Sequence, residues 1–371
     1  MKTLLTAMLA GAALFVQAQT PPDPSKEGPY PVGVTTTVIV DSTRTDRFTE
    51  KPRTLVTEIW YPATDEARNM PKNRFHDFFP GGITPEVAAV IQASYHLSAD
   101  ELDKIFWNNS VRDAPVRAGR FPLVIFGHGN GGSRQQNTFW CDYLASHGYI
   151  VVSPDHTGNS RHAIIDGQLI RYQSKERAHS TEDRPKDMSK LLDEMILWDK
   201  GKSDDKQAKR FAGHIDTAHS AVSGMSLGSY CAVQAADADT RFAAMVGMAA
   251  APSKHTNLTI PSLYFLGRKD GTIGQIGNMM IKNVYEAHSG PSMLLELING
   301  GHYSFTDMFK LSHSFGDGIG EAFTPMETTY AIVNSYSTAF LGYFLKGQKA
   351  YGKYLEGNPW PNELAIQRKG F

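Results

Sequence analysis

Gly224-Met225-Ser226-Leu227-Gly228 is the segment of this chain that most strongly indicates a fold. It fits the pattern G-x-S-x-G, follows a short apolar run and precedes residues that favour a helix. A serine on a tight strand-to-helix turn projects its hydroxyl above the edge of a sheet, and only small residues such as Gly224 and Gly228 let the backbone bend so sharply. We therefore predict that Ser226 is a nucleophile. An ordinary Gly/Ser turn is the alternative, because the pattern also occurs by chance.

A serine that attacks acyl groups needs a base and an orienting acid, and on this kind of turn the chain order is Ser, then Asp or Glu, then His. The apolar run 261–266 predicts a buried strand, and Asp270 lies in the loop after it. The run 293–298 predicts another strand, which leads into a loop where two glycines precede His302. We predict that Asp270 is the acid and His302 the base.

A glycine-rich segment lies upstream of the serine. The run 121–126 predicts a strand that leads into Gly127-His128-Gly129-Asn130-Gly131-Gly132. The tetrahedral intermediate of acyl transfer carries negative charge, which backbone N–H donors stabilise in a water-poor site. We expect the amides of Asn130 and Leu227 to form this oxyanion hole, since Leu227 begins a helix, where N–H groups are free. Phosphate binding is the alternative, but the segment lacks the Lys-Ser/Thr ending of a P-loop and the dinucleotide-binding glycine spacing.

Together these segments resemble the α/β-hydrolase superfamily, and within it the secreted esterases similar to dienelactone hydrolases and to platelet-activating-factor acetylhydrolases. The resemblance covers most of the chain after its N-terminal segment. It implies an α/β fold with a mostly parallel sheet of about eight strands, helices on both faces and helical cap insertions. Besides the segments above, the motifs that carry it are Trp60-Tyr61-Pro62-Ala63, Ser153-Pro154-Asp155-His156 with Gly158-Asn159, and Gly301-His302 with Phe305-Thr306-Asp307.

The chain departs from both groups of relatives at the catalytic positions. Dienelactone hydrolases use a cysteine nucleophile, whereas this chain has Ser226. We call the turn at 224–228 the elbow. Plasma-type acetylhydrolases carry the acid after the strand that follows the helix of this elbow, but here that strand, 242–249, ends in a run of alanines. We therefore assign the acid to Asp270, after the next strand, and treat Asp155 and Asp307 as its rivals.

Apolar runs predict eight strands, and the later ones alternate with helical segments, so they are expected to be parallel. We expect one α/β-hydrolase domain over residues 33–371, with insertions at about 69–116 and 156–214. The expected strands are 34–40, 55–61, 123–126, 149–153, 220–223, 242–249, 262–266 and 293–298.

Helices are expected in both insertions. The first contains a helical stretch at 83–96 and a helix capped by Ser98 and Glu101. The second contains 184–198, whose apolar residues fall on one face. These helices are candidates for a cap over the site, with packing on the outside of the sheet as the alternative. Four residues are candidates for an acyl or alcohol pocket, or else for the core: Phe78, Phe79, Trp107 and His156.

The closing helix has a clear start signal in the segment Thr324-Pro325-Met326-Glu327. This segment combines a capping box with a proline at the first helical position, and the helical run ends at Gly347. We expect this helix to lie behind His302.

The N-terminal residues predict a secretory signal peptide at 1–18. Met1-Lys2 gives a positive start, Leu4 to Val16 is apolar, and Val16-Gln17-Ala18 supplies small residues for cleavage. About thirteen apolar residues fall short of the roughly 20 that span a bilayer, so a stable membrane anchor is not expected. A proline-rich leader follows at 19–32. The protein is thus expected to be secreted or periplasmic.

Composition agrees with an enzyme rather than a tail or scaffold. The formal net charge is -1, without a basic stripe, so a nucleic-acid partner is not expected. Cys141 and Cys231 are the only two cysteines, and we expect them on opposite faces of the sheet, hence unbridged. The chain contains His128, His156 and His162 but no closely spaced zinc motif, so neither a metal nor a cofactor is expected.

The predicted chemistry is two-step acyl transfer. Its simplest form is the hydrolysis of a carboxylic ester in a small-molecule or lipid-like substrate. A serine peptidase or amidase shares the same constellation and is the alternative enzyme. A non-catalytic binding member of the fold would be expected to have lost a triad residue, and this chain has Ser226, Asp270 and His302.

Overall fold

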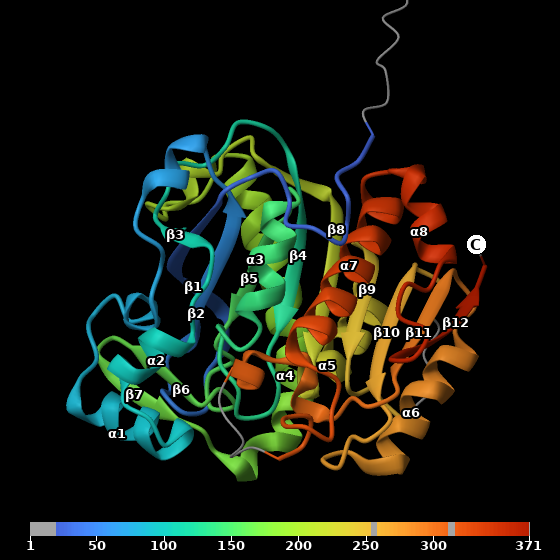
Figure 1. Cartoon of the computed structure of the whole chain (residues 1–371). Helices are drawn as coiled ribbons and strands as arrows, with labels where there is room; N and C mark the ends of the chain where they lie inside the picture. The colour runs from blue at the N-terminus through green and yellow to red at the C-terminus, as the bar shows by residue number, and fades with distance from the viewer. Residues whose placement is uncertain (1–19, 254–257, 311–315, 371) are drawn as a thin grey trace, which may run out of the picture.

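One sheet of ten strands forms the centre of the molecule (Figure 1). The computed structural model describes residues 20–253, 258–310 and 316–370. The strand order is β12-β11-β10-β9-β8-β4-β5-β2-β1-β3, and β6 and β7 form a separate hairpin. The strands are β1 (Val32–Thr45), β2 (Pro52–Pro62), β3 (Ser110–Arg112), β4 (Phe121–Gly127), β5 (Ile150–Pro154), β6 (His162–Ile165), β7 (Gln168–Arg171), β8 (Ile215–Met225), β9 (Phe242–Met248), β10 (Ser262–Gly267), β11 (Ser292–Leu297) and β12 (Leu364–Lys369).

The central strands, from β5 through β4, β8, β9 and β10 to β11, are parallel. Every residue of β4, β5, β10 and β11 is buried, as expected for parallel strands that are covered on both faces. The register between β4 and β8 pairs Gly127 with Gly224. The loops that follow these two strands therefore begin side by side at the carboxyl edge of the sheet, where ligands bind in open α/β folds.

Helices cover both faces of the sheet (Figure 1). The helices α3 and α7 lie on one face, and α4, α5 and α6 bury their apolar sides in a second core on the other. The helices are α1 (Pro85–Tyr95), α2 (Ala99–Ile105), α3 (Thr138–Ser146), α4 (Arg177–Asp199), α5 (Leu227–Ala238), α6 (Gly274–Ala287), α7 (Met326–Leu345) and α8 (Gly352–Glu356).

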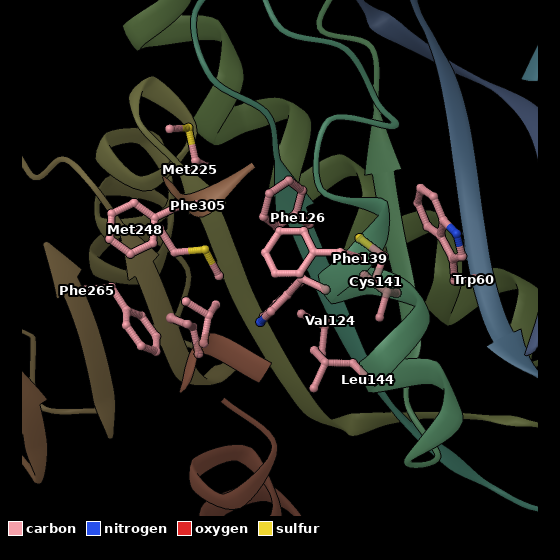
Figure 2. Close-up of a cluster of buried hydrophobic side chains, with 14 of the residues drawn as sticks. Trp60, Val124, Phe126, Phe139, Cys141, Leu144, Met225, Met248, Phe265 and Phe305 are labelled. Carbon is pink, nitrogen blue, oxygen red and sulfur yellow. The ribbon is translucent and has the colours of Figure 1, made fainter. Parts of the chain in front are cut away.

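The first core lies between α3, α7 and the sheet. Figure 2 shows Phe139 and Leu144 of α3 beside Val124 and Phe126 of β4, and all four side chains are buried. Cys141 belongs to this core, whereas Cys231 belongs to the core on the other face, and both thiols are free. Burial raises the pKa of both thiols, which keeps them in the neutral form of a small apolar side chain.

All eight predicted strands are present, and the mostly parallel sheet with helices on both faces is confirmed. Four further strands, β3, β6, β7 and β12, were not predicted. The closing helix α7 starts at Met326 with Pro325 as its N-cap residue and without a side-chain cap bond, so the predicted capping box of Thr324 and Glu327 is wrong. The box predicted for Ser98 and Glu101 at the start of α2 is present.

The helix of the second insertion belongs to the layer that covers the sheet. In α4 the side chains of Met188, Leu191, Leu192 and Met195 are fully buried against β4, β8 and α5. This is the packing of an ordinary crossover helix between β5 and β8. The helices α1 and α2 lie instead near the hairpin β6–β7, at the carboxyl edge of the sheet (Figure 1).

The expected signal peptide lies outside the described residues. Within residues 20–253, 258–310 and 316–370, no helix has both the length and the apolar character needed to cross a membrane.

Candidate active site

Ser226 lies at the turn between β8 and α5, with φ 54° and ψ -124°. Few residues other than glycine adopt a positive φ, and strained backbone of this kind is concentrated at functional sites. A Cβ on Gly224 would lie 2.3 Å from the backbone of Gly228, and one on Gly228 would lie 1.9 Å from the carbonyl oxygen of Gly127. Both glycines of the G-x-S-x-G pattern are therefore required by close backbone contacts.

The structure brings Ser226, His302 and Asp270 into one chain of hydrogen bonds. The Nε2 atom of His302 lies 2.9 Å from the Ser226 hydroxyl oxygen, and its Nδ1 atom lies 2.7 Å from a carboxylate oxygen of Asp270. His302 and Asp270 are 3% and 4% exposed, while Ser226 is half-buried. Ser226 is therefore partly open to solvent, whereas the groups behind it are shielded from water.

Backbone amides fix the carboxylate of Asp270 in its orientation. Its Oδ1 atom accepts hydrogen bonds from the amides of Thr272 and Ile273, at 3.0 and 2.9 Å, which leaves Oδ2 for His302. Asp270 follows β10 directly, in the loop expected from the sequence. Because the amides hold one oxygen, the carboxylate cannot rotate away from the imidazole without losing two hydrogen bonds.

Asp317 joins the loop of His302 to the loop of Asp270, and no motif in the sequence indicated this role. Its carboxylate accepts hydrogen bonds from the amide of His302 at 3.1 Å and from the amide and hydroxyl of Thr272 at 2.7 Å each. Burial raises the pKa of this carboxyl, but these donors outweigh burial and lower it overall. A Cβ on Gly301 would lie 2.5 Å from the same carboxylate, which explains the glycine before His302.

The segment 127–132 forms a loop beside the elbow. Some of its backbone amides donate hydrogen bonds to other described residues, and others do not. The amide of Gly129 donates to the side chain of Gln136 at 2.6 Å, and the amide of Gly131 donates to the carbonyl of Asn159 at 3.0 Å. Within the described part of the chain, the amide of Asn130 between them has no acceptor. Leu227 is the first residue of α5, where an amide has no partner within the helix.

A buried arginine holds this loop from the opposite side. Arg184 of α4 is fully buried; its guanidinium donates to the carbonyl of His128 and, at 2.8 Å, to the side-chain oxygen of Asn159. The Asn159 amide group in turn donates to the side-chain oxygen of Asn130 at 2.8 Å. These contacts link the crossover helix to Asn130, and the sequence showed Arg184 only as a polar residue of a helix.

The rival acids are paired elsewhere. Asp155 accepts hydrogen bonds from the backbone and the guanidinium of Arg134, and Asp307 pairs with Lys310 at 2.8 Å. Burial raises the pKa of both carboxyls. Neither carboxylate is hydrogen-bonded to His302, whose Nδ1 atom contacts Asp270.

The histidines near the loop 127–132 contact other groups of the protein, as residues with a structural role do. His128 contacts the Gly129 carbonyl through Nδ1 and accepts a hydrogen bond from the amide of His156 at Nε2. Burial lowers the pKa of His156 to about 3, and its Nδ1 atom lies 2.8 Å from Asp187. Burial also lowers the pKa of His162 to about 3. These rings are therefore neutral at physiological pH.

A small cavity of about 110 Å³ is lined by residues 130–132 of the loop and by Tyr303, which follows His302. Its walls include Tyr303, whose ring contacts that of His302, and three aromatic residues of the first insertion. Phe78 and Phe79 are instead buried core residues, and Trp107 is 62% exposed and lines a different cavity between α3 and α7. The three aromatic residues, which we call the aromatic wall, are Phe75, Tyr95 and Phe106.

With this geometry in place, comparison with known proteins identifies the family. The family model described as platelet-activating factor acetylhydrolase, isoform II, matches residues 15–341. The chain belongs to this family. The platelet-activating factor acetylhydrolase of Cavia porcellus is 24% identical over 285 residues, which cover 67% of this chain and 62% of that relative. The chain thus spans less than two thirds of the length of this curated acetylhydrolase.

A solved structure shows the same fold. A ferulic acid esterase from Streptomyces cinnamoneus superposes with a TM-score of 0.67 at 20% sequence identity, and the match covers 95% of this chain and 98% of the esterase. The chain is thus an α/β-hydrolase-fold member of the acetylhydrolase family, as the resemblance in its motifs predicted.

Proposed function

We propose that this chain is a secreted serine hydrolase that cleaves carboxylic esters through Ser226, His302 and Asp270. The observation that carries the proposal is the pair of hydrogen bonds at 2.9 and 2.7 Å that joins the three side chains on a strained elbow. Membership of the acetylhydrolase family supports ester bonds as the substrate class.

In the first step, His302 Nε2 accepts the proton of the Ser226 hydroxyl while its oxygen attacks the ester carbonyl. Asp270 accepts a hydrogen bond from Nδ1–H of the imidazole and stabilises the imidazolium that forms. The amides of Asn130 and Leu227 donate to the oxyanion. The imidazolium then protonates the leaving alcohol, which leaves an acyl-enzyme on Ser226.

In the second step, water attacks the acyl-enzyme with His302 again as the base, and the acid is released. No metal or cofactor takes part in this scheme. The scheme requires that the imidazole be neutral and carry its proton on Nδ1, the tautomer that Asp270 favours as an acceptor.

The direct test is a panel of p-nitrophenyl esters from acetyl to palmitoyl, run beside aminoacyl anilides. We expect ester hydrolysis with a burst of p-nitrophenol as the acyl-enzyme accumulates, and much slower anilide hydrolysis. Faster turnover of anilides than of esters would replace the esterase with a peptidase or amidase. An acetylated phospholipid in the same panel tests whether the activity named for the relative extends to this chain.

Export is the second part of the proposal. It rests on the positive start, apolar segment and small residues at 1–18, which lie outside the described residues. Expression of the full chain in a bacterial host, followed by fractionation and N-terminal sequencing, should recover a periplasmic or extracellular protein that begins near residue 19. Recovery of an intact N-terminus from the cytoplasm would contradict this part alone.

The contacts of Arg184 predict an effect on kcat from a residue outside the triad. In Arg184→Lys the charge stays, but one ammonium cannot reach both the carbonyl of His128 and the side chain of Asn159 in the planar geometry of a guanidinium. We expect kcat to fall by about 10- to 100-fold, less than the 10²–10³ that loss of an oxyanion donor costs. KM should change little, since the oxyanion contacts strengthen in the transition state.

Steady-state kinetics with p-nitrophenyl acetate and a thermal melt of each variant test this prediction. Lys186→Gln, on the exposed side of the same helix, is the control and should keep the wild-type kcat. A folded Arg184→Lys enzyme with unchanged kcat would show that the loop keeps its position without these bonds.

A further inference from the structure

Arg161 carries a positive charge that the proposed mechanism does not use. Within the described residues, no carboxylate forms an ion pair with its guanidinium, and its buried Nη1 atom has no hydrogen-bond partner. Two buried arginines near the site have acceptors for their guanidinium groups: Arg134 pairs with Glu58 and Asp155, and Arg184 donates to two oxygen acceptors. An unpaired cation in a partly buried position is costly unless a ligand completes it.

The aromatic wall fixes the position of this guanidinium. Its central carbon lies 4.4 Å from the ring centroid of Tyr95, which is buried against Phe75 and Phe106. The backbone amide of Arg161 donates to the carbonyl of Gly132. A stacked guanidinium loses less freedom when a ligand binds, because its plane is already oriented.

Arg161 lies between two cavities that share the wall of the proposed oxyanion loop. It lines the 110 Å³ cavity together with Asn130 and Tyr303, and it lines a second cavity of about 300 Å³ together with Gly131 and Tyr172. Arg161 and Asn130, whose amide is a proposed oxyanion donor, therefore line the same cavity.

The charges around these cavities favour an anion. The lining of the 300 Å³ cavity contains Arg171 as well as Arg161 and no acidic residue. Asp307 is the only acid in the lining of the 110 Å³ cavity, and it is paired with Lys310. Arg171 is exposed to solvent, so Arg161 carries the partly buried positive charge of this lining.

We propose that Arg161 forms a subsite for a negatively charged group, a carboxylate or phosphate, on one arm of the ester substrate. The planar fork of a guanidinium matches both oxyanions with two parallel hydrogen bonds. The subsite rests on the proposed esterase function and deepens it, because it selects anionic esters over neutral esters of the same size. Arg161 is thus a specificity residue and takes no part in proton transfer.

The test uses two matched pairs of substrates. Mono-p-nitrophenyl glutarate and p-nitrophenyl pentanoate differ by a carboxylate at the end of the acyl chain. Acetylglycerol phosphate and acetylglycerol differ by a phosphate on the alcohol, and release of acetate is measured. The readout is the ratio of kcat/KM for the anionic ester to kcat/KM for its neutral partner, in wild type, Arg161→Gln, Arg161→Lys and Arg120→Gln.

We expect the wild-type ratio to exceed one by about tenfold or more in one pair, and to fall by about 10- to 100-fold in Arg161→Gln. Arg161→Lys should keep part of the preference. Arg120→Gln removes one positive charge at the opposite edge of the sheet, before β4, and should leave the ratio unchanged. The pair that responds identifies the anion: the first pair a carboxylate on the acyl side, the second a phosphate on the alcohol side.

Three outcomes would overturn the subsite: no preference for the anionic ester in either pair, a ratio unchanged in Arg161→Gln, or an equal loss in Arg120→Gln. If Arg161→Gln does not fold, the test is whether glutarate or glycerol phosphate inhibits the hydrolysis of p-nitrophenyl pentanoate by the wild-type enzyme. Inhibition by either anion supports the subsite, and absence of inhibition by both contradicts it. Failure to hydrolyse any of the four esters would contradict the proposed function instead.

Discussion

Replacement of Ser226 by alanine is expected to lower kcat by about 10⁶-fold, as removal of the serine does in other triad hydrolases. The rate that remains should come from the oxyanion amides and substrate binding alone. Alanine has the same Cβ as serine, so the strain of the positive φ at this position is unchanged. The Ser226 side chain has one hydrogen bond, to His302, and is half-buried, so stability should change by less than about 1 kcal/mol.

The measurement is the p-nitrophenyl acetate rate of Ser226→Ala, together with its thermal melt. The neighbouring residue Ser229 serves as the control. Ser229 donates to the carbonyl of Ala250 at 2.6 Å, and the two ring nitrogens of His302 contact Asp270 and Ser226, so Ser229→Ala should keep most of the rate. A Ser226→Ala enzyme with a tenth of the wild-type rate would exclude Ser226 as the nucleophile.

A serine-directed organophosphonate gives an independent readout. It should add one adduct to the wild type, on the peptide that contains Ser226, and none to Ser226→Ala. An adduct on Ser223 or Ser229 would assign the role of nucleophile to that serine instead.

The core of this fold could be predicted because its strands carry strong local signals. Strands such as β4 and β11 are buried throughout, so they appear in the sequence as continuous apolar runs. The strands that were missed lack this property. β3 has three residues, and β12 lies at the edge of the sheet, where only Leu364 of its six residues is buried.

The supporting residues of the candidate site could not be predicted, because they depend on contacts between distant segments. Asp317 contacts His302 and Thr272 across 15 and 45 positions, and it lies in a loop without a motif. Arg184 is a charged residue beside the apolar face of α4, and a sequence pattern would place such a residue in solvent. Periodicity alone does not tell whether residues 184–198 form a cap helix or a helix that covers the sheet, since both kinds of helix bury one face.

Replacement of Asp270 by asparagine is expected to lower kcat by about 10⁴-fold while the fold is kept. The amides of Thr272 and Ile273 donate to Oδ1, and an asparagine oxygen can accept both bonds. The asparagine NH₂ group then occupies the position of Oδ2, 2.7 Å from Nδ1 of His302. Since NH₂ is only a donor, Nδ1 must become the acceptor and the ring proton moves to Nε2.

The imidazole would then present N–H to Ser226 and could no longer accept the serine proton, which is the physical reason for the loss. Because the defect is in the tautomer, KM and the thermal melt should stay close to the wild type. Organophosphonate labelling of Ser226 should slow with kcat, since it needs the same base.

The rival carboxylates supply the matched control for this assignment. Asp307 lies five positions after His302 and is buried against Lys310 and the amide of Phe139, so Asp307→Asn should lower kcat far less than the roughly 10⁴-fold expected for loss of the orienting acid. Near-normal turnover by Asp270→Asn, or a 10⁴-fold loss in Asp307→Asn with an intact fold, would transfer the role of the acid. The two amides that fix Oδ1 and the distance of 2.7 Å from Oδ2 to Nδ1 favour Asp270, because Asp307 is bonded to partners outside the imidazole.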